Sequence, residues 1–250
     1  MRPAAYAGLG LAAYSAFLVA TTPATWVGAQ TQAALQGRVE VSDTRGTLWR
    51  GQARVSFAPS RNRVSLDTVE WSFAPSRLFA GEVAFDARAR GAGLQAAARV
   101  ARSFAGWDVR DLKADGDASG LAIVVPILAA WRPAGPVAIT SPEFTIRGRE
   151  ARGTIEAQWR DASTALSDVR PLGSYSATWK AVSGPGKIEV ATIKGPLRVT
   201  GSGTASASSG FTFSGEARAE GEAAKALEPL LDLMGPKRPD GARALELRLE

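Results

Sequence analysis

The 250-residue sequence contains no histidine and no cysteine. These absences exclude zinc and haem sites that depend on either residue, nucleophile systems of the Ser-His-Asp or Cys-His type, and every disulfide. The lack of cysteine is compatible with an oxidising compartment such as the periplasm. The net charge is +6, but the basic residues are scattered and form no long run. Since nucleic-acid-binding surfaces carry clustered Lys and Arg, we expect solvated strand faces and no nucleic-acid partner.

Two carboxylate pairs, Asp108 with Asp111 and Asp115 with Asp117, are the main candidates for acid–base chemistry. A catalytic pair needs a cleft and two environments that separate the pKa values. Here Asp115-Gly116-Asp117 is typical of a polar turn, in which Asp117 caps a helix. No D-x-D-G spacing with a late Glu indicates a calcium loop. We therefore assign neither pair to catalysis or to a metal.

Glycine-rich stretches at Gly91–Gly93 and Gly201–Gly203 lack the Lys and the following helix that a phosphate cradle requires. They are more typical of hairpins and strand edges. A hydrolase that uses a Ser-Lys pair is the remaining enzymatic alternative, and no S-x-x-K motif supports it. The sequence thus predicts a protein that is not an enzyme, with no catalytic, cofactor-binding or metal-binding residues and no cofactor.

The N-terminal 20 residues are the most apolar part of the chain. Ala4–Ala20 is uncharged and follows Arg2, and Thr21–Val27 extends the uncharged stretch to Trp26. A helix that rises about 1.5 Å per residue would nearly span a bilayer over this length, with Trp26 at the headgroups. Residues 1–27 are therefore predicted to form a cytoplasmic stub and a transmembrane helix. The positive-inside rule places the rest of the chain in the periplasm, anchored at the inner membrane.

A cleaved signal peptide is the alternative for this segment. Val27-Gly28-Ala29 offers the small residues that a signal peptidase prefers. The apolar run is longer than a usual signal core, and the basic region before it is one Arg. Both interpretations export the remainder of the chain.

After Gln30 the sequence alternates between apolar and polar residues, which predicts strands. In Gly81–Arg90, Val83 and Phe85 fall on one face and Asp86 and Arg88 on the other. Strands with one apolar face are typical of antiparallel sheets, so the fold class is mainly β. The predicted strands are Gly37–Asp43, Gly46–Trp49, Ala53–Ala58, Val64–Phe73, Gly81–Arg90, Leu94–Val100, Trp107–Ala114, Val137–Ile146, Ala151–Trp159, Gly173–Trp179, Lys187–Ile193, Pro196–Ser202, Phe211–Ala219 and Ala244–Leu249.

Two segments are predicted to be short helices, Asp117–Trp131 and Glu222–Met234. The second carries Leu227, Leu230, Leu231 and Met234 at the spacing of one helical face.

The predicted helices belong to an internal repeat. Arg45-Gly46-Thr47-Leu48 resembles Arg152-Gly153-Thr154-Ile155, and Val69-Glu70-Trp71 resembles Ala177-Thr178-Trp179. Pro126-Ile127-Leu128 likewise resembles Pro229-Leu230-Leu231, and all offsets lie between 103 and 108 residues. A near-constant offset predicts two related β-rich units, residues 28–135 and 136–250, each with a short helix near its end.

The chain has seven tryptophans, of which Trp49, Trp71, Trp159 and Trp179 lie in predicted strands. Their ordinary role is core packing. The alternative is that they line an apolar surface for a partner or a lipid chain.

Three groups of motifs occur in the order found in a known family. Pro23-Ala24-Thr25-Trp26-Val27 follows the apolar segment. Gly46-Thr47-Leu48-Trp49-Arg50-Gly51 precedes Val69-Glu70-Trp71 and Pro75-Ser76-Arg77-Leu78-Phe79-Ala80-Gly81. Leu172-Gly173-Ser174-Tyr175 with Trp179 precedes Gly195-Pro196-Leu197 and Gly201-Ser202-Gly203-Thr204. This order resembles the protein N family of the type II secretion system over nearly the whole chain.

The resemblance implies a non-enzymatic, single-pass inner-membrane component with a periplasmic β domain. Such a component would support export of folded proteins across the outer membrane through contacts with other secretion subunits, in the inner membrane or at the secretin. The alternative is a periplasmic lipid-binding or lipid-passing module, since similar β-groove units occur in lipid-handling proteins of the bacterial envelope.

Overall fold

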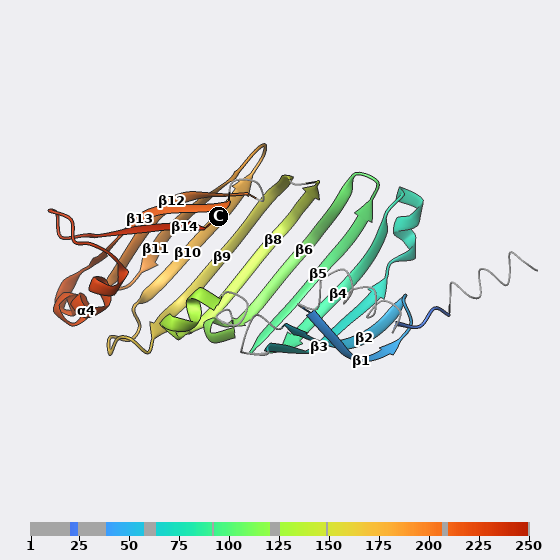
Figure 1. Ribbon diagram of the computed structural model, residues 1–250, viewed down its shortest axis with the longest axis horizontal. Coiled ribbons are helices and arrows are strands. Elements are labelled where there is room, and N and C mark those ends of the chain that lie inside the picture. The colour runs from blue at the N-terminus through green and yellow to red at the C-terminus, as the bar shows by residue number, and fades with distance from the viewer. Residues whose placement is uncertain are drawn as a thin grey trace, which may run out of the picture.

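A long curved antiparallel sheet makes up most of this computed structural model, which describes residues 21–24, 39–57, 64–91, 93–120, 126–148, 150–206 and 210–249 (Figure 1). Each strand pairs with the next along the chain, except that β6 pairs with β8 and the short β7 pairs with β9. The strands are β1 Val39–Gly46, β2 Arg50–Phe57, β3 Val64–Phe73, β4 Val83–Gly91, β5 Leu94–Ser103, β6 Gly106–Asp117, β7 Pro133–Ala134, β8 Pro136–Arg147, β9 Glu150–Thr164, β10 Gly173–Ala181, β11 Gly186–Lys194, β12 Leu197–Ser206, β13 Gly210–Ala219 and β14 Arg243–Leu249.

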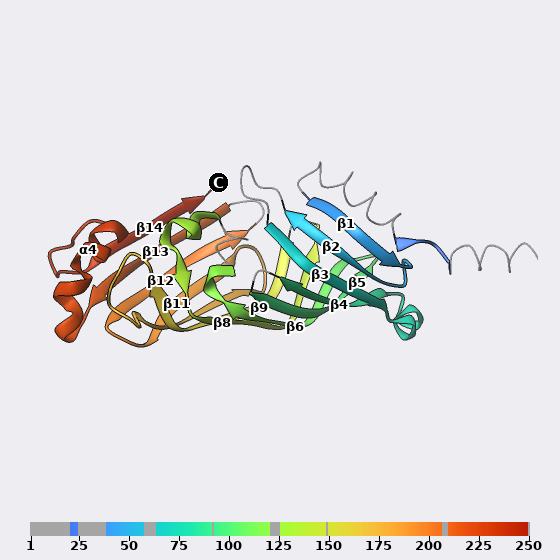
Figure 2. The same ribbon diagram turned by 90° about the horizontal axis from the view of Figure 1, so that it is seen from below.

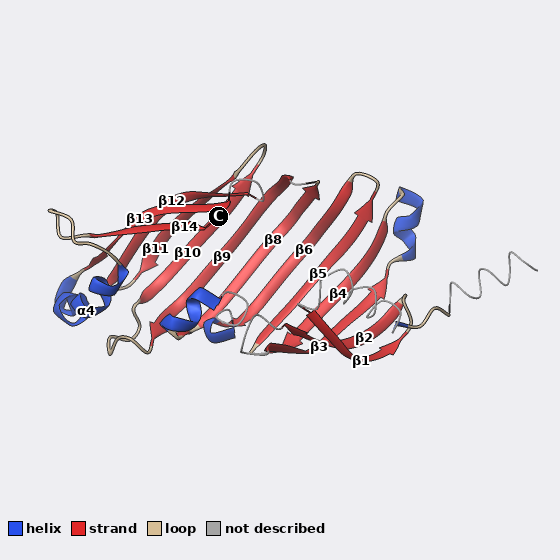
Figure 3. Cartoon of the chain, in the orientation of Figure 1, coloured by secondary structure: helices blue, strands red, loops and turns tan. Residues whose placement is uncertain are grey.

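The predicted class, mainly antiparallel β, is confirmed, and most predicted strands match observed ones within a few residues. The strand expected at Gly46–Trp49 is wrong. β1 runs on to Gly46, whose φ of +92° turns the chain, and Thr47 then closes a tight turn with Arg50. Figure 3 shows how little of the described chain is helical.

The helix expected at Glu222–Met234 is present as η3 (Gly221–Ala223) followed by α4 (Ala224–Met234). In the segment expected to be helical, Asp117–Trp131, only Asp117 belongs to a strand, as the last residue of β6. Residues 118–120 are helical, η2 is a 3-10 helix over Pro126–Trp131, and residues 121–125 lie outside the described part of the chain. A further 3-10 helix, η1 (Pro75–Ala80), was not predicted; it opens on a proline and closes on Gly81 with a φ of +71°.

The sheet is bent into a trough, and its two faces differ in chemistry. One row of paired residues crosses eleven strands from β3 to β14 and is apolar throughout. It consists of Val69, Ala89, Ala96, Ala114, Ile139, Ala157, Ala177, Val190, Gly201, Gly215 and Leu245. We call the face that carries this row the inner face. It is the concave side, where η2 and α4 lie (Figure 2).

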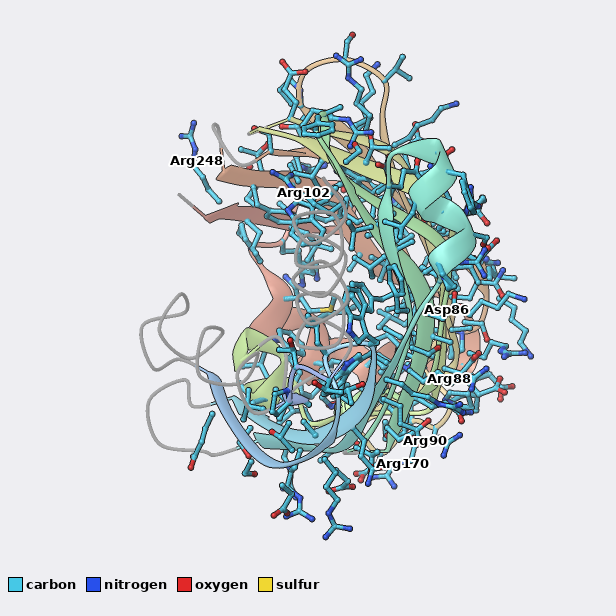
Figure 4. The ribbon with its side chains drawn as sticks, turned by 90° about the vertical axis from the view of Figure 1, so that its right-hand side faces the viewer. Asp86, Arg88, Arg90, Arg102, Arg170 and Arg248 are labelled. Carbon is cyan, nitrogen blue, oxygen red and sulfur yellow. The ribbon has the colours of Figure 1, made fainter. Side chains whose placement is uncertain are left out.

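The adjacent row, one residue along each strand, is polar except for one alanine. It consists of Glu70, Arg88, Ala97, Lys113, Thr140, Glu156, Thr178, Glu189, Ser202, Ser214 and Glu246. Because successive side chains of a strand point to opposite faces, this row lies on the convex outer face. Figure 4 shows Asp86, Arg88 and Arg90 projecting from that face, as the alternation in β4 predicted.

The largest buried cluster lies at the C-terminal end of the trough. Leu227, Leu230 and Leu231 of α4 pack with Leu172 and Leu197 against the inner face. Arg243 of β14 is buried and pairs with Asp232, which ties the edge strand to the same helix. This contact between helix and sheet holds α4 over the inner face.

Among the described residues, no helix is long and apolar enough to cross a membrane. The transmembrane helix predicted within residues 1–27 falls almost entirely outside the described part of the chain.

Candidate functional site

An apolar cavity of about 390 Å³ lies on the inner face, between the sheet and the elements that cover it. Its floor comes from five neighbouring strands, β8 to β12, and its cover from η2, β7 and α4. The floor residues on the inner face are Val137, Ile139, Ala157, Trp159, Tyr175, Ala177, Val190, Leu197 and Val199. The covering residues include Trp131, Pro133, Leu230 and Met234.

The cavity exists because small side chains occupy the middle of its floor. Ala157 and Ala177 are direct neighbours across β9 and β10, and Val190 follows Ala177 on β11. Larger side chains stand beside them, with the rings of Trp159 and Tyr175 6.0 Å apart. The leucines of α4 pack in the core and hold the helix above this floor. A space therefore remains between helix and sheet where the floor side chains are small.

Three polar side chains of the wall, Trp159, Tyr175 and Thr164, donate hydrogen bonds to the protein itself. The Trp159 indole N–H donates to the Ala134 carbonyl at 3.2 Å, and the Tyr175 hydroxyl donates to the Leu197 carbonyl at 3.0 Å. The Thr164 hydroxyl donates to the Trp131 carbonyl. Burial raises the pKa of Tyr175 above its ordinary value, so this hydroxyl stays neutral. An apolar, uncharged lining favours a ligand portion that is itself apolar.

The Gly46–Gly51 motif forms a compact turn at the other end of the sheet. The Thr47 N–H donates to the Arg50 carbonyl at 2.9 Å, and the Trp71 indole donates to the Leu48 carbonyl at 3.0 Å. Gly51 is required because a Cβ there would lie 2.6 Å from the Trp71 ring. The motif therefore has a structural role, in which Trp71 and the turn hold each other in place.

The same turn holds the segment that follows the apolar N-terminus. The Leu48 N–H donates to the Thr22 carbonyl at 2.9 Å, and Pro23 forms an isolated bridge with Thr47. Ala24 is buried. The segment that directly follows residues 1–20 therefore lies beside the β1–β2 turn.

The candidate carboxylates do not come together as a catalytic pair. Asp108 is buried and pairs with Arg147 at 2.7 Å. Asp117 accepts hydrogen bonds from the Ser119 hydroxyl, from the Ser119 N–H and from the N–H of Gly135 just before β8, and these bonds lower its pKa. Asp117 therefore caps the helical residues 118–120, as its sequence context indicated. The polar turn expected at Asp115-Gly116-Asp117 is wrong, because all three residues lie in β6. Within the described residues, no group of three or more acidic side chains could hold a metal ion.

A second depression, of about 460 Å³, lies near the motif turn and is polar. Arg45, Arg50 and Arg88 line it together with Glu70 and Asp86. Because charged side chains of both signs line this depression and are open to solvent, it is less distinctive than the apolar cavity.

The tryptophans predicted in strands have separate roles. Trp49 packs on Phe73 with ring centroids 4.7 Å apart, and Trp179 contacts Phe144 edge-on at 6.4 Å. Only Trp159 of the four lines the cavity. Sequence reasoning missed Trp131, whose signal was its place in a segment expected to be helical.

A family model described as type II secretion system (T2SS), protein N, matches residues 37–246. The chain belongs to the protein N family of the type II secretion system. No curated protein and no solved structure shows a significant match. The protein N match begins just before β1 and ends within β14, so it spans the whole described sheet.

Proposed function

We propose that this protein is an inner-membrane component that supports export of folded proteins by the type II secretion system. Residues 4–20 act as a retained anchor, and the sheet works in the periplasm through contacts with other secretion subunits. Family membership over residues 37–246 is the observation that carries the proposal. The uncharged segment that precedes the matched residues supports the anchor.

The position of the Thr22–Ala24 segment supports a defined orientation at the membrane. It is bound to the β1–β2 turn, which lies on the same edge of the sheet as the β3–β4, β5–β6, β8–β9 and β10–β11 connections. We call this edge the hairpin rim, residues 45–50, 74–82, 102–107, 147–150 and 180–187. η2 and α4 lie toward the opposite edge (Figure 1). The anchor therefore leaves from the hairpin rim.

Exposed side chains and charge on the hairpin rim also favour a lipid surface. Phe79 and Phe104 are fully exposed, and Val182 is largely exposed. Aromatic rings of this kind are favoured at the bilayer interface. The described rim residues include seven basic side chains, Arg45, Arg50, Arg77, Arg102, Arg147, Lys180 and Lys187, and the two acids Glu82 and Glu150. Each exposed cation adds attraction to anionic lipid.

The absence of cysteine makes this orientation testable with single labels. The full chain with Phe104→Cys or Leu233→Cys is labelled with an environment-sensitive dye and placed in proteoliposomes that contain a quenching lipid. Leu233 is the matched control, because it is an exposed apolar residue of α4 near the opposite edge. We expect strong quenching at position 104 and little at position 233. Equal quenching at both positions would contradict the orientation.

Partner contacts are proposed for the polar outer face, which carries the row from Glu70 to Glu246. Photo-crosslinking residues at Glu156 and Thr178 are compared with one at Ala157 on the inner face, in intact envelopes. We expect adducts with secretion subunits from the outer positions and fewer from Ala157. Repeated recovery of no secretion subunit from any outer position would overturn the secretion role.

The two-unit architecture, 28–135 and 136–250, is also a proposal. β4 begins at Val83 and β11 at Gly186, and β5 begins at Leu94 and β12 at Leu197, differences of 103 residues in both cases. These offsets agree with the motif offsets in the sequence. The units would then be joined without interruption, since β6 pairs with β8.

The apolar inner face favours a second candidate function, a lipid-binding or lipid-passing module. Its supporting observation is the eleven-residue apolar row together with the cavity that lies on it. This candidate is compatible with family membership and makes a separate prediction about ligand chemistry.

A further inference from the structure

We infer that the cavity between β8–β12 and the covering elements η2 and α4 binds a single alkyl chain of a lipid or fatty acid. The inference deepens the lipid-binding candidate and does not depend on the secretion role. It follows from the dimensions of the cavity, the chemistry of its wall and the side chains that define its floor.

The dimensions suit one extended chain. Five neighbouring strands form the floor, and strands lie about 4.8 Å apart, so the floor is roughly 19 Å across. A volume of about 390 Å³ over that length is compatible with one extended alkyl chain.

The chemistry of the wall favours a ligand whose buried part is wholly apolar. Trp159, Tyr175 and Thr164 each donate to a backbone carbonyl of the wall, so these donors are already used. No ionised side chain lines the cavity among the described residues. A ligand with a buried carboxylate or phosphate would lose its hydration without compensation, whereas an alkyl chain loses nothing. The headgroup of the ligand therefore stays in the open part of the trough.

The floor provides the means to block the site. Ala177 lies at the centre of the floor, between Ala157 and Val190. Ala177→Phe places a ring in the space where the chain would lie. Ala96→Phe is the matched control, because Ala96 belongs to the same apolar row on β5, outside the cavity.

The test uses the full chain in nanodiscs and two photoreactive probes. One arm adds a soluble fatty acid with a terminal diazirine, and the other uses nanodiscs made with a phospholipid whose acyl chain carries the diazirine. After irradiation and digestion with trypsin, which does not cut before Pro171, adducts are mapped by mass spectrometry on the fragments Asp161–Lys180 and Ile188–Lys194. These fragments contain the floor residues Tyr175, Ala177 and Val190. The two arms distinguish a free fatty acid from a membrane lipid as the source of the chain.

We expect adducts on both fragments in at least one arm, with a loss of fivefold or more in Ala177→Phe and no loss in Ala96→Phe. Shortening the fatty-acid probe by two methylenes should weaken labelling about tenfold, because each buried methylene contributes separately. Thermal unfolding by circular dichroism checks that Ala177→Phe is folded.

Three outcomes would overturn the inference. Labelling of the floor that persists in folded Ala177→Phe, or no labelling of the floor in either arm, would remove the site. Adducts confined to β1–β6 would also remove it, although the broader lipid-binding candidate would survive. A loss of secretion in the crosslinking variants has no bearing on these results.

Discussion

The two ends of the trough bury different residues, although the same alternation of apolar and polar side chains runs through the strands of both. Before residue 121, the buried apolar residues of the described chain are all alanines: Ala24, Ala53, Ala84, Ala101 and Ala118. After residue 135 they include Val137, Leu172, Leu197, Leu227, Leu230 and Leu231. The C-terminal half therefore has a core in the ordinary sense, because α4 covers its inner face.

The N-terminal half is held together mainly within the sheet. Trp49, Phe73 and Phe85 form a ladder of rings across β3 and β4, with centroids 4.7 and 5.5 Å apart. Cross-strand aromatic pairs stabilise a sheet without needing a second layer. Its inner face thus keeps half-buried aromatic rings, whereas the C-terminal half sequesters its leucines. The C-terminal half therefore buries its large apolar side chains, whereas the N-terminal half leaves them partly exposed on its inner face.

The largest effect expected from this contrast is at Leu227, which is fully buried in α4. Leu227→Ala should lower the free energy of unfolding by about 3 kcal/mol, because it leaves a cavity in the only leucine cluster of the described chain. Urea denaturation measures the loss. Phe85→Ala is the counterpart in the N-terminal half and should cost less, since Phe85 is only half-buried. Equal losses would show that coverage by α4 does not distinguish the halves.

Glycines that face tryptophans provide a second comparison, since each half contains one. A Cβ at Gly186 would lie 2.1 Å from Trp179 Nε1, and one at Gly51 would lie 2.6 Å from Trp71 Cζ2. Gly186→Ala and Gly51→Ala should each destabilise the protein by about 1–3 kcal/mol, because the ring must move. A shift of tryptophan fluorescence reports the movement.

The control for both glycine variants is Gly184→Ala. Gly184 has a φ of +74°, and nothing lies within 4 Å of its added Cβ. This variant should cost about 1 kcal/mol from backbone strain and leave the fluorescence unchanged. A fluorescence shift in Gly184→Ala as large as that in Gly186→Ala would argue against ring displacement as the cause.

Much of the sheet could be predicted from the sequence because period-two alternation is a local signal. The pair Val83 and Phe85 was correctly assigned to one face of its strand, and the pair Asp86 and Arg88 to the other. The error at Gly46–Trp49 has a physical cause. The sequence of the motif suggests a strand, but the segment forms a turn that is closed by the hydrogen bond from Thr47 to Arg50. The turn is also held by Trp71, more than 20 positions along the chain, whose indole donates to the Leu48 carbonyl.

The cavity could be predicted only in part. The spacing of Leu230 and Met234 indicated an apolar helix face, and the tryptophans suggested an apolar surface. Neither signal shows that Ala157 and Ala177 become neighbours in the floor, because that depends on the register between β9 and β10. Register is set by bulges and by the sheet as a whole, which alternation along one strand does not contain.

A smaller effect is expected at Arg110 of β6, which binds Glu82 just before β4 and Glu143 of β8. It makes a two-point ion pair with Glu82 at 3.0 and 3.2 Å and contacts Glu143 at 3.2 Å. The hydrogen bond to Arg110 lowers the pKa of Glu82 below its ordinary value of 4.5. The stability that this pair contributes is therefore complete above pH 4.5 and is lost as the pH falls through the lowered pKa.

Glu82→Gln should make the acid side of the stability–pH curve less steep below pH 4.5. Urea midpoints measured at pH steps from neutral to strongly acidic conditions give the curve. Glu150→Gln is a suitable control, because Glu150 is exposed and its partner Arg152 is exposed as well. Parallel curves for wild type and Glu82→Gln would contradict the role assigned to Arg110.

The smallest effect should come from the exposed pair of Arg198 and Glu220 in the C-terminal half, 2.9 Å apart. Both side chains are about half exposed, so water and salt screen their attraction. A double-mutant cycle with Arg198→Ala and Glu220→Ala should give a coupling of about 0.5 kcal/mol or less, which declines at high salt. A cycle on Arg110 and Glu82 should give a larger value that resists salt, because those side chains are more buried. A stronger coupling in the exposed pair would contradict side-chain burial as the cause of the difference between the two ion pairs.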